Sequence, residues 1–368
     1  MSLDPQRSSK VSRRKLMVRA GTGMAAITVG AALSPAFSPA KAAFGSMLSP
    51  DDINLNVQME EIVDAYMALH PLPIQILTAP NARNLPTPRD AVEAVLTMHH
   101  QSNLVEPVGS VKHILIPGPG GQLIARVYTP FGSGPFPVLV YFHGGGWVIA
   151  NLDAYDSSCR ALTNAAKFIV VSVAYRQAPE HPFPAAADDA YASTQWVMAN
   201  AASLNGIPSK VAVGGESAGG NLAAVTALRA RDLGTRMPIY QLLVYPITNH
   251  NFDTPSYMEY ANAPFLTRAA MMYFWQNYLP NPAAGNNPYA SPLRAASLAH
   301  LPPATVIVDE NDPLRSEGTA YAERLRAAGV PTVFTVYLGV THEFFSMSAV
   351  LDQARRAVAE AAAGLRSA

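Results

Sequence analysis

A serine flanked by small residues stands in the middle of the segment Gly215-Glu216-Ser217-Ala218-Gly219. The segment follows the strand-like run VAVGG and precedes residues with helical spacing, so Ser217 is expected at a sharp strand-to-helix turn. Such a turn crowds the positions two residues away on each side, where Gly215 and Gly219 carry no side chain. The helix after Ser217 would also direct its dipole and free N–H groups at a negative charge formed there. Ser217 is therefore a candidate nucleophile, although a serine that merely caps a helix would leave the same short motif.

A nucleophilic serine needs a base, and the base needs an acid that orients it. For serines on such turns the chain order is serine, then acid, then histidine. Of the nine histidines, only His300 and His342 follow both Ser217 and a segment that could supply the acid. His300 comes before the acids of the strand-like run PATVIVD, whereas His342 directly follows the strand-like run TVFTVYL. Because sites collect at the carboxyl ends of strands, His342 is the predicted base.

Three acids, Asp309, Glu310 and Asp312, stand within VIVDENDPLR, where the run PATVIVD ends. Asp309 could still belong to the strand. Asp312 precedes Pro313, which holds residue 312 extended and could aim its carboxylate across the sheet edge. The residues alone favour Asp312 as the orienting acid and leave Asp309 open as the alternative.

Three glycines, Gly144, Gly145 and Gly146, follow His143 where the apolar run PVLVYF ends. Attack on an ester or amide carbonyl creates an oxyanion, which is stabilised by backbone N–H donors that approach it closely. The residue after the nucleophile, Ala218, supplies one donor, and a glycine loop of this type is the known source of the others. His143 is expected to brace the loop rather than to act as the base. A side chain at Gly144 or Gly145 should cost turnover far more than stability.

The elements that must position these residues follow a regular pattern after residue 105. Near-continuous apolar runs alternate with helical ones, which predicts a mostly parallel sheet of about eight strands with helices on both faces. Two runs around Gly118-Pro119-Gly120-Gly121 predict an antiparallel hairpin at one edge. The alternation fails in residues 43–104, which are helical and punctuated by proline, and in 247–290, a stretch of the length of a lid or insertion.

The charge and the cysteine content of the chain exclude some classes of partner and of cross-link. The whole chain carries 26 basic and 26 acidic residues, but residues 1–42 hold seven of the basic and one of the acidic ones. The remaining body is mildly acidic, which argues against nucleic acid or an anionic membrane as partner. The single cysteine, Cys159, excludes an internal disulfide framework. No HExxH or clustered Cys/His pattern occurs, so we expect neither a metal nor another cofactor.

The N-terminus has the features of an export signal. Ser12-Arg13-Arg14-Lys15-Leu16-Met17 is similar to a twin-arginine signal, and a weakly apolar stretch leads to the small-x-small pattern Ala40-Lys41-Ala42. That stretch is too short and too glycine-rich to span a bilayer, so no stable membrane span is expected after signal removal. We expect residues 1–42 to be a twin-arginine-type signal peptide and the mature protein to be periplasmic or extracellular.

Taken together, the motifs resemble the hormone-sensitive-lipase-like esterases, or bacterial family IV, of the α/β-hydrolase superfamily. The resemblance covers roughly residues 105–365 and rests on HGGGW, SSCRAL, YRQAPEHPFPAAADD, GESAGGN, LLVYP, NPYASPLRA, DPLRSEG and His342. It implies the α/β-hydrolase fold, with Ser217 as nucleophile, Asp312 as acid and His342 as base. It also implies an oxyanion hole of Gly144, Gly145 and Ala218.

The resemblance further implies a helical cap. Residues 43–104 would form part of it, and residues 105–368 would be the catalytic domain, with a cap insertion at about 247–290. Three residues depart from the family pattern: Glu216 stands where Asp or Thr is more common, Glu343 where Gly is usual, and Ala174 where an Asp is common. The change at residue 343 would alter the turn that presents His342, and the change at residue 174 would remove a structural partner of a basic neighbour.

The predicted function is that of an exported serine carboxylesterase. Its partner would be a small-molecule ester of a short to medium acyl chain, cleaved through an acyl-enzyme intermediate. One alternative is amide or peptide hydrolysis by the same machinery, which the HGGGW motif and the short N-terminal segment disfavour. A second is a ligand-binding relative without catalysis, which the complete triad disfavours. The oligomeric state stays open, with a homodimer as one candidate.

Overall fold

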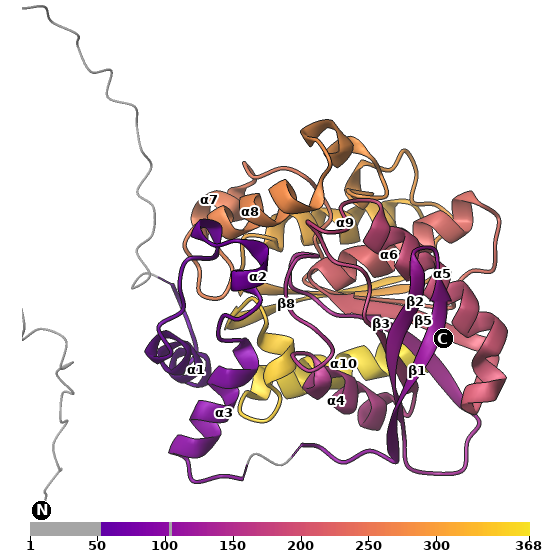
Figure 1. Cartoon of the computed structure of the whole chain (residues 1–368), viewed down its shortest axis with the longest axis horizontal. Helices are drawn as coiled ribbons and strands as arrows, with labels where there is room; N and C mark the ends of the chain where they lie inside the picture. Colours follow the sequence, from indigo (N-terminus) through magenta and orange to yellow (C-terminus); the bar gives the residue numbers. More distant parts are fainter. Residues whose placement is uncertain (1–52, 103–104) are drawn as a thin grey trace, which may run out of the picture. The chain divides into compact units, whose positions relative to one another are not determined.

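The core of the molecule is a single eight-stranded sheet, drawn in Figure 1. The computed structural model describes residues 53–102 and 105–368. The predicted signal peptide, residues 1–42, and the first residues of the predicted cap segment lie outside the described residues. The strands are β1 (Ser110–Gly118), β2 (Gly121–Thr129), β3 (Phe136–Phe142), β4 (Ile169–Val173), β5 (Gly206–Glu216), β6 (Gln241–Val244), β7 (Ala304–Asn311) and β8 (Thr332–Thr341).

The strands lie in the order β1-β2-β4-β3-β5-β6-β7-β8. β1 pairs antiparallel with β2, and β2 antiparallel with β4, whereas all pairs from β4 to β8 are parallel. All five residues of β4, Ile-Val-Val-Ser-Val, are buried, as expected for a parallel strand covered on both faces. The predicted fold class is confirmed, including the antiparallel hairpin at one edge.

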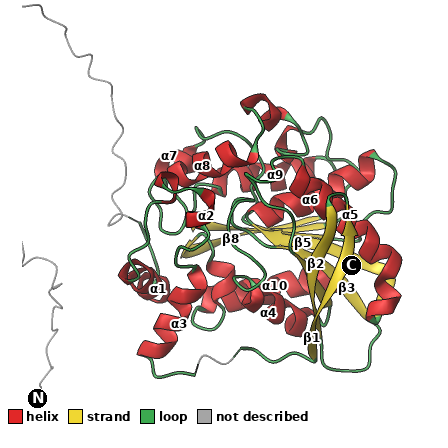
Figure 2. Cartoon of the chain, viewed as in Figure 1, coloured by secondary structure: helices red, strands yellow, loops and turns green. Residues whose placement is uncertain are grey.

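Helices cover both faces of this sheet (Figure 2). The helices are α1 (Val57–Ala68), α2 (Ala79–Ala82), α3 (Pro88–Met98), α4 (Asp156–Ala166), α5 (Ala185–Asn200), α6 (Ala218–Asp232), α7 (Pro255–Glu259), α8 (Arg268–Tyr278), α9 (Arg315–Ala327) and α10 (Asp352–Arg366). One hydrophobic core includes residues of α5, α6, α8 and α9, and a second includes residues of α1, α3, α4 and α10. The sheet therefore separates two cores.

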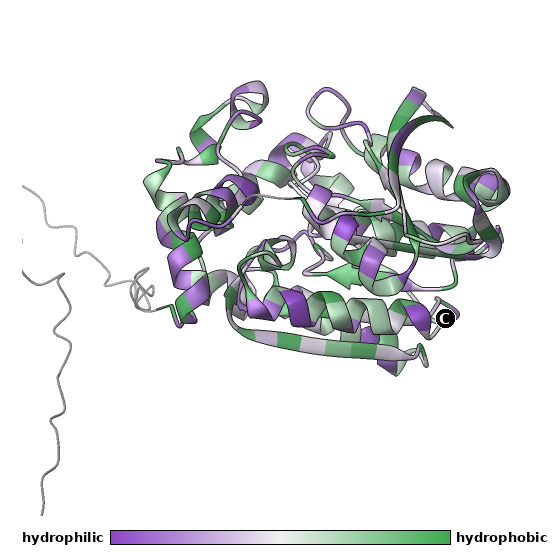
Figure 3. Ribbon diagram, turned by 90° about the horizontal axis from the view of Figure 1, so that it is seen from below, coloured by the Kyte–Doolittle hydropathy of each residue, from purple (hydrophilic) through white to green (hydrophobic). Residues whose placement is uncertain are grey.

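The sequence of α10 explains why it covers a core. Its buried residues recur at intervals of three and four, which places them on one face of the helix. The hydropathy colouring in Figure 3 shows helices with hydrophilic and hydrophobic residues side by side. Burying the apolar face of such a helix stabilises the fold by roughly 25 cal/mol per Å² of apolar surface removed from water.

The N-terminal helices are tied to the catalytic part of the chain. The Asn56 side chain caps α1 by accepting from the Met59 N–H at 3.0 Å, and its amide donates to the Gly339 carbonyl in β8 at 2.8 Å. A capping box of Thr87 and Asp90 begins α3. Farther along the chain, α8 lies in the range predicted as the cap insertion and contacts the short helix η3 (Ile74–Ile76). The division into cap and catalytic domain stays a prediction.

Candidate active site

Ser217 stands at the turn between β5 and α6, with φ of 55° and ψ of −117°. A β-carbon on Gly215 would lie 2.4 Å from the Phe142 carbonyl oxygen, and one on Gly219 would lie 1.8 Å from the same atom. Real β-carbons do not approach a carbonyl oxygen so closely. The tight turn at Ser217 therefore requires glycine on both sides, as the sequence pattern indicated.

The structure brings Ser217, His342 and Asp312 together. His342 Nε2 lies 3.0 Å from Ser217 Oγ, and His342 Nδ1 lies 2.7 Å from Asp312 Oδ2. The other Asp312 oxygen, Oδ1, accepts from the Leu314 N–H at 2.8 Å, which fixes the carboxylate. All three side chains are buried. This chain of contacts can move a proton from a serine hydroxyl to an imidazole that a carboxylate orients.

The rejected candidates lie elsewhere. His300 is exposed, in the approach to β7. The Glu310 carboxylate accepts from the Gly339 N–H at 2.7 Å and so engages β8 rather than His342.

Asp309, the alternative acid, lies beside the chosen one. One carboxyl oxygen of Asp309, one carboxyl oxygen of Asp312 and one ring nitrogen of His342 lie within 4.8 Å of one another. Neither Asp309 oxygen has a hydrogen-bond partner among the described residues. Two ionised carboxylates cannot hydrogen-bond, but a protonated one can donate to the other. Burial, and then the charge of Asp312, raises the pKa of Asp309 well above its ordinary value, which favours the neutral form of this carboxyl group.

The glycine loop after β3 leaves N–H groups free. The N–H groups of Gly144, Gly145 and Ala218 donate to no other group within residues 53–102 and 105–368. His143 is buried, stacks on Tyr175 with ring centroids 4.5 Å apart, and places Nδ1 2.8 Å from the Gly144 carbonyl oxygen. Burial lowers the pKa of His143 to about 4, so it stays neutral and can brace the loop.

Helix α8 holds the same loop from the other side, a contact that the sequence did not predict. Trp147, directly after the glycines, stacks on Tyr278 at 4.0 Å between ring centroids. A β-carbon on Gly146 would lie 2.2 Å from the ring of Phe274. In the sequence, only the aromatic residues within 267–278 could have indicated this contact. Aromatic residues are common in buried helices, so they do not indicate it specifically.

Glu216, the residue before Ser217, is held by two tyrosines. Its carboxylate is fully buried and accepts hydrogen bonds from the hydroxyls of Tyr141 and Tyr245. Burial, and then the charge of Glu343, raises the pKa of Glu216 to about 7. Arg176, the basic residue near Ala174, still has an acidic partner, because it forms an ion pair with Asp189 at 2.8 Å.

Glu343 shares the site with His342. It adopts φ of 73°, a left-handed conformation that glycine would adopt without strain. Its Oε1 lies 4.0 Å from His342 Nε2, and the Tyr155 hydroxyl lies 2.8 and 2.9 Å from its two carboxylate oxygens. Burial raises the pKa of Glu343, while the charge of His342 and the Tyr155 hydrogen bond oppose that rise. Tyr155 carries no motif and was not predicted.

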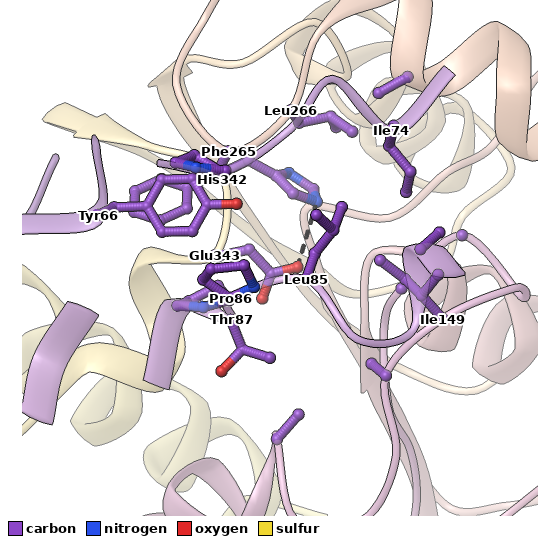
Figure 4. Close-up of a pocket in the computed structure, with 18 of the residues that line it drawn as sticks. Tyr66, Ile74, Leu85, Pro86, Thr87, Ile149, Phe265, Leu266, His342 and Glu343 are labelled. Carbon is purple, nitrogen blue, oxygen red and sulfur yellow. Dashed lines mark ion pairs between the residues drawn. The ribbon is translucent and has the colours of Figure 1, made fainter. Parts of the chain in front are cut away.

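A pocket of about 1010 Å³ opens onto Ser217 and His342. Figure 4 shows Tyr66, Phe265, Leu266 and Ile149 around it, and Glu343 beside His342. Its lining comes from the N-terminal segment, the glycine loop and the segment before α8. The exposed surface of the pocket is mostly apolar.

Two further features concern metals and membranes. One group of three residues in the described part of the chain has donor atoms close enough to hold a metal ion, and it consists of Asp309, Asp312 and His342. We attribute that cluster to the hydrogen-bonded acid and base and to the neutral carboxyl group beside them. Within the same residues no helix combines the length and the apolar character needed to cross a membrane.

The known proteins that this chain resembles include α/β hydrolases and esterases. A family described as having the alpha/beta hydrolase fold matches residues 139–346. The carboxylic ester hydrolase LipN of Mycobacterium tuberculosis is 44% identical over 247 residues, which span 64% of this chain and 65% of LipN. Esterase LipI of the same organism is 39% identical over 318 residues, or 84% of this chain and 98% of LipI. The solved structure of a hyperthermophilic esterase from the archaeon Pyrobaculum calidifontis has a TM-score of 0.78 at 40% identity, covering 86% of this chain and 99% of its own.

Proposed function

The chain belongs to the hormone-sensitive-lipase-like esterases of the α/β-hydrolase superfamily and is a carboxylesterase, and from this premise we propose which residues cleave the ester. Ser217 is the nucleophile, His342 the general base and Asp312 the acid that orients it. Two distances support this assignment: 3.0 Å from Ser217 Oγ to His342 Nε2, and 2.7 Å from His342 Nδ1 to Asp312 Oδ2.

The first half of the reaction forms an acyl-enzyme. Ser217 Oγ attacks the carbonyl carbon while His342 Nε2 takes the hydroxyl proton. The carbonyl oxygen becomes an oxyanion, which accepts hydrogen bonds from the N–H groups of Gly144, Gly145 and Ala218. His342 then returns the proton to the leaving alcohol. The free state of those three N–H groups supports their role.

Electrostatics favour the charged imidazole that forms during this step. Burial by itself lowers the pKa of His342, but the charge of Asp312, its hydrogen bond and the charge of Glu343 outweigh burial and raise it. An imidazole with a raised pKa accepts the serine proton more readily. It must still be neutral before the reaction, so the enzyme works above that pKa.

The proposed substrate class rests on the family resemblance, and the pocket is compatible with it. Its walls near Tyr66, Phe265 and Leu266 are apolar, and its volume of about 1010 Å³ exceeds what an acetyl group needs. We therefore assign esters of short to medium acyl chains. A series of p-nitrophenyl esters from acetate to laurate, assayed with one preparation, tests this assignment. Maximal kcat/KM at the longest chain would contradict it.

The catalytic assignment is tested by three variants. Mature protein should hydrolyse p-nitrophenyl butyrate, and Ser217→Ala and His342→Ala should each reduce kcat by about 10⁴-fold or more while the circular dichroism spectrum stays the same. His300→Ala, which alters an exposed histidine, is the matched control and should retain full activity. Undiminished turnover by Ser217→Ala would refute the mechanism.

We also propose that residues 1–42 direct export by the twin-arginine route, which would place the enzyme in the periplasm or outside the cell. The support is the Arg13-Arg14 pair and the apolar stretch after it. Replacing both arginines by lysine should retain esterase activity inside the cell, and unchanged export would contradict the proposal. A homodimer stays a prediction, which sedimentation of the mature protein would test.

A further inference from the structure

Glu343 places a second carboxylate against the catalytic imidazole, on the side opposite Asp312. Asp312 contacts His342 Nδ1, whereas Glu343 Oε1 lies 4.0 Å from Nε2, the atom that exchanges protons during the reaction. The Glu343 side chain is 13% exposed and lines the same pocket as Ser217 and His342 (Figure 4). A group bound at Nε2 would therefore also lie beside this carboxylate.

The backbone at this position suggests that the carboxylate is kept for a purpose. Glu343 adopts φ of 73°, which glycine adopts freely and which costs a residue with a side chain roughly 1 kcal/mol or more. Strain of this kind persists where the surrounding structure holds it, and it clusters at functional sites. Here the Tyr155 hydroxyl holds both carboxylate oxygens, at 2.8 and 2.9 Å.

The distance of 4.0 Å suits one water molecule. A water that donates two hydrogen bonds of about 2.8 Å, diverging at roughly 105°, joins acceptors that are about 4.4 Å apart. The separation between His342 Nε2 and Glu343 Oε1 is close to that span. A water between them would direct one hydrogen at each acceptor and leave its oxygen lone pairs free to attack.

We propose that Glu343 is a catalytic residue of the deacylation step, in which it binds and orients the water that attacks the acyl-enzyme. The inference rests on the proposed function of Ser217 and His342. Tyr155 is the positioning residue, since its hydroxyl keeps the Glu343 carboxylate beside Nε2.

The step balances in atoms and charge. The water oxygen forms a bond to the acyl carbon, one of its protons passes to His342 Nε2, and its other hydrogen stays on that oxygen and donates a hydrogen bond to Glu343. The tetrahedral intermediate then breaks its bond to Ser217 Oγ, which takes the proton from His342. The products are the carboxylic acid and the free serine, and Glu343 ends as it began.

Competition between water and methanol tests the proposal. Methanol has one hydroxyl hydrogen, so it can donate to His342 Nε2 but not also to Glu343. Wild-type protein is given p-nitrophenyl butyrate in buffer with methanol, and butyric acid and methyl butyrate are measured by NMR. In Glu343→Gly, whose backbone suits φ of 73° and should fold, the ratio of hydrolysis to methanolysis should fall about tenfold, the worth of one hydrogen bond to a charged group.

Further variants separate this role from a structural one. Glu343→Gln keeps an uncharged acceptor and should give a ratio between those of wild type and Glu343→Gly. Glu61→Gln, which removes a carboxylate from the surface of α1, should leave the ratio unchanged. A ratio for Glu343→Gly within twofold of wild type would overturn the proposal. If wild-type protein releases no p-nitrophenol, the proposed function fails instead.

Discussion

A carboxyl oxygen of Asp309 lies within 4.8 Å of a carboxyl oxygen of Asp312, and both side chains are fully buried. Two charges of the same sign at that distance, without water around them, disfavour each other's ionisation. Asp312 has compensating partners, because His342 Nδ1 and the Leu314 N–H contact it, whereas Asp309 has none among the described residues. Burial therefore favours the protonated form of Asp309, whose pKa is raised well above its ordinary value.

The first prediction follows from that proton. Because the pKa of Asp309 is raised in the folded state, folded protein holds a proton that unfolded protein releases above about pH 4. This group costs stability as pH rises, by about 1.4 kcal/mol per pH unit until the folded pKa is reached. Asp309→Asn removes the cost, so its stability relative to wild type should increase from pH 5 to pH 8. Urea denaturation at each pH measures this difference.

The control for this measurement is Asp253→Asn, which removes a carboxyl group that is 79% exposed. Its stability relative to wild type should stay constant over the same range. A constant difference for Asp309→Asn as well would mean that Asp309 is ionised in the folded state.

The second prediction concerns the pH dependence of catalysis. The pKa of His342 lies above 6.5, so kcat/KM should fall as pH drops through a midpoint above 6.5. Because the pKa of His342 is raised in the folded protein, protonation of His342 stabilises the folded state below about pH 6.5. This contribution is lost as pH rises through the pKa of His342 in the folded protein. Glu343→Gln removes one of the charges that raise the pKa, so the midpoint should move down by about half to one pH unit. An upward or absent shift would show that Glu343 carries no charge at the midpoint.

The third prediction addresses the orienting acid. Asp312→Asn presents an amide to His342 Nδ1 and favours the wrong tautomer, with Nε2 protonated and unable to take the serine proton. By analogy with other serine hydrolases, kcat should fall by about 10⁴-fold with little change in KM. Steady-state kinetics with p-nitrophenyl butyrate measures this loss. A loss below tenfold would indicate that Asp309 can replace Asp312.

The sequence was enough to predict the sharp turn that holds Ser217. Ser217 and its glycines stand within five positions of one another, and the sharp turn follows from local sterics. The alternation of apolar strands with helices predicted the sheet for a similar reason, because burial on both faces leaves a pattern in each strand.

The sequence could not predict contacts that depend on distant pairing. Tyr155 and Glu343 are 188 residues apart. Tyr155 stands in no motif, and Glu343, although it directly follows His342, has no sequence feature that would pair it with Tyr155. Only its departure from the glycine that the family resemblance implies marks Glu343 in the sequence. The protonation of Asp309 also depends on its burial beside Asp312, which is a property of the folded β7 end and not of the residue type.

The last prediction separates two costs at the glycine loop. A β-carbon on Gly144 would lie 2.3 Å from the Tyr155 hydroxyl, at the far end of a side chain, whereas one on Gly145 would lie 2.3 Å from the Ile149 carbonyl oxygen. Gly145 also has φ of 93°. A backbone carbonyl cannot move away from an added β-carbon as easily as the end of a side chain can. The expectation that both positions cost turnover far more than stability therefore stays a prediction for Gly144 and is revised for Gly145.

Gly144→Ala should reduce kcat by about 10²- to 10³-fold, the cost of a displaced oxyanion donor. Its loss of unfolding free energy should be smaller than that of Gly145→Ala, because the nearest atom is the Tyr155 hydroxyl and not a backbone carbonyl. Gly145→Ala should lose similar turnover and also about 2 kcal/mol or more of unfolding free energy. Gly329→Ala is the matched control, because Gly329 has φ of 77° but nothing within 4 Å of an added β-carbon. It should show the backbone cost alone, about 1 kcal/mol, with full activity. Equal stability losses at Gly145 and Gly329 would mean that the Ile149 carbonyl moves aside at no cost.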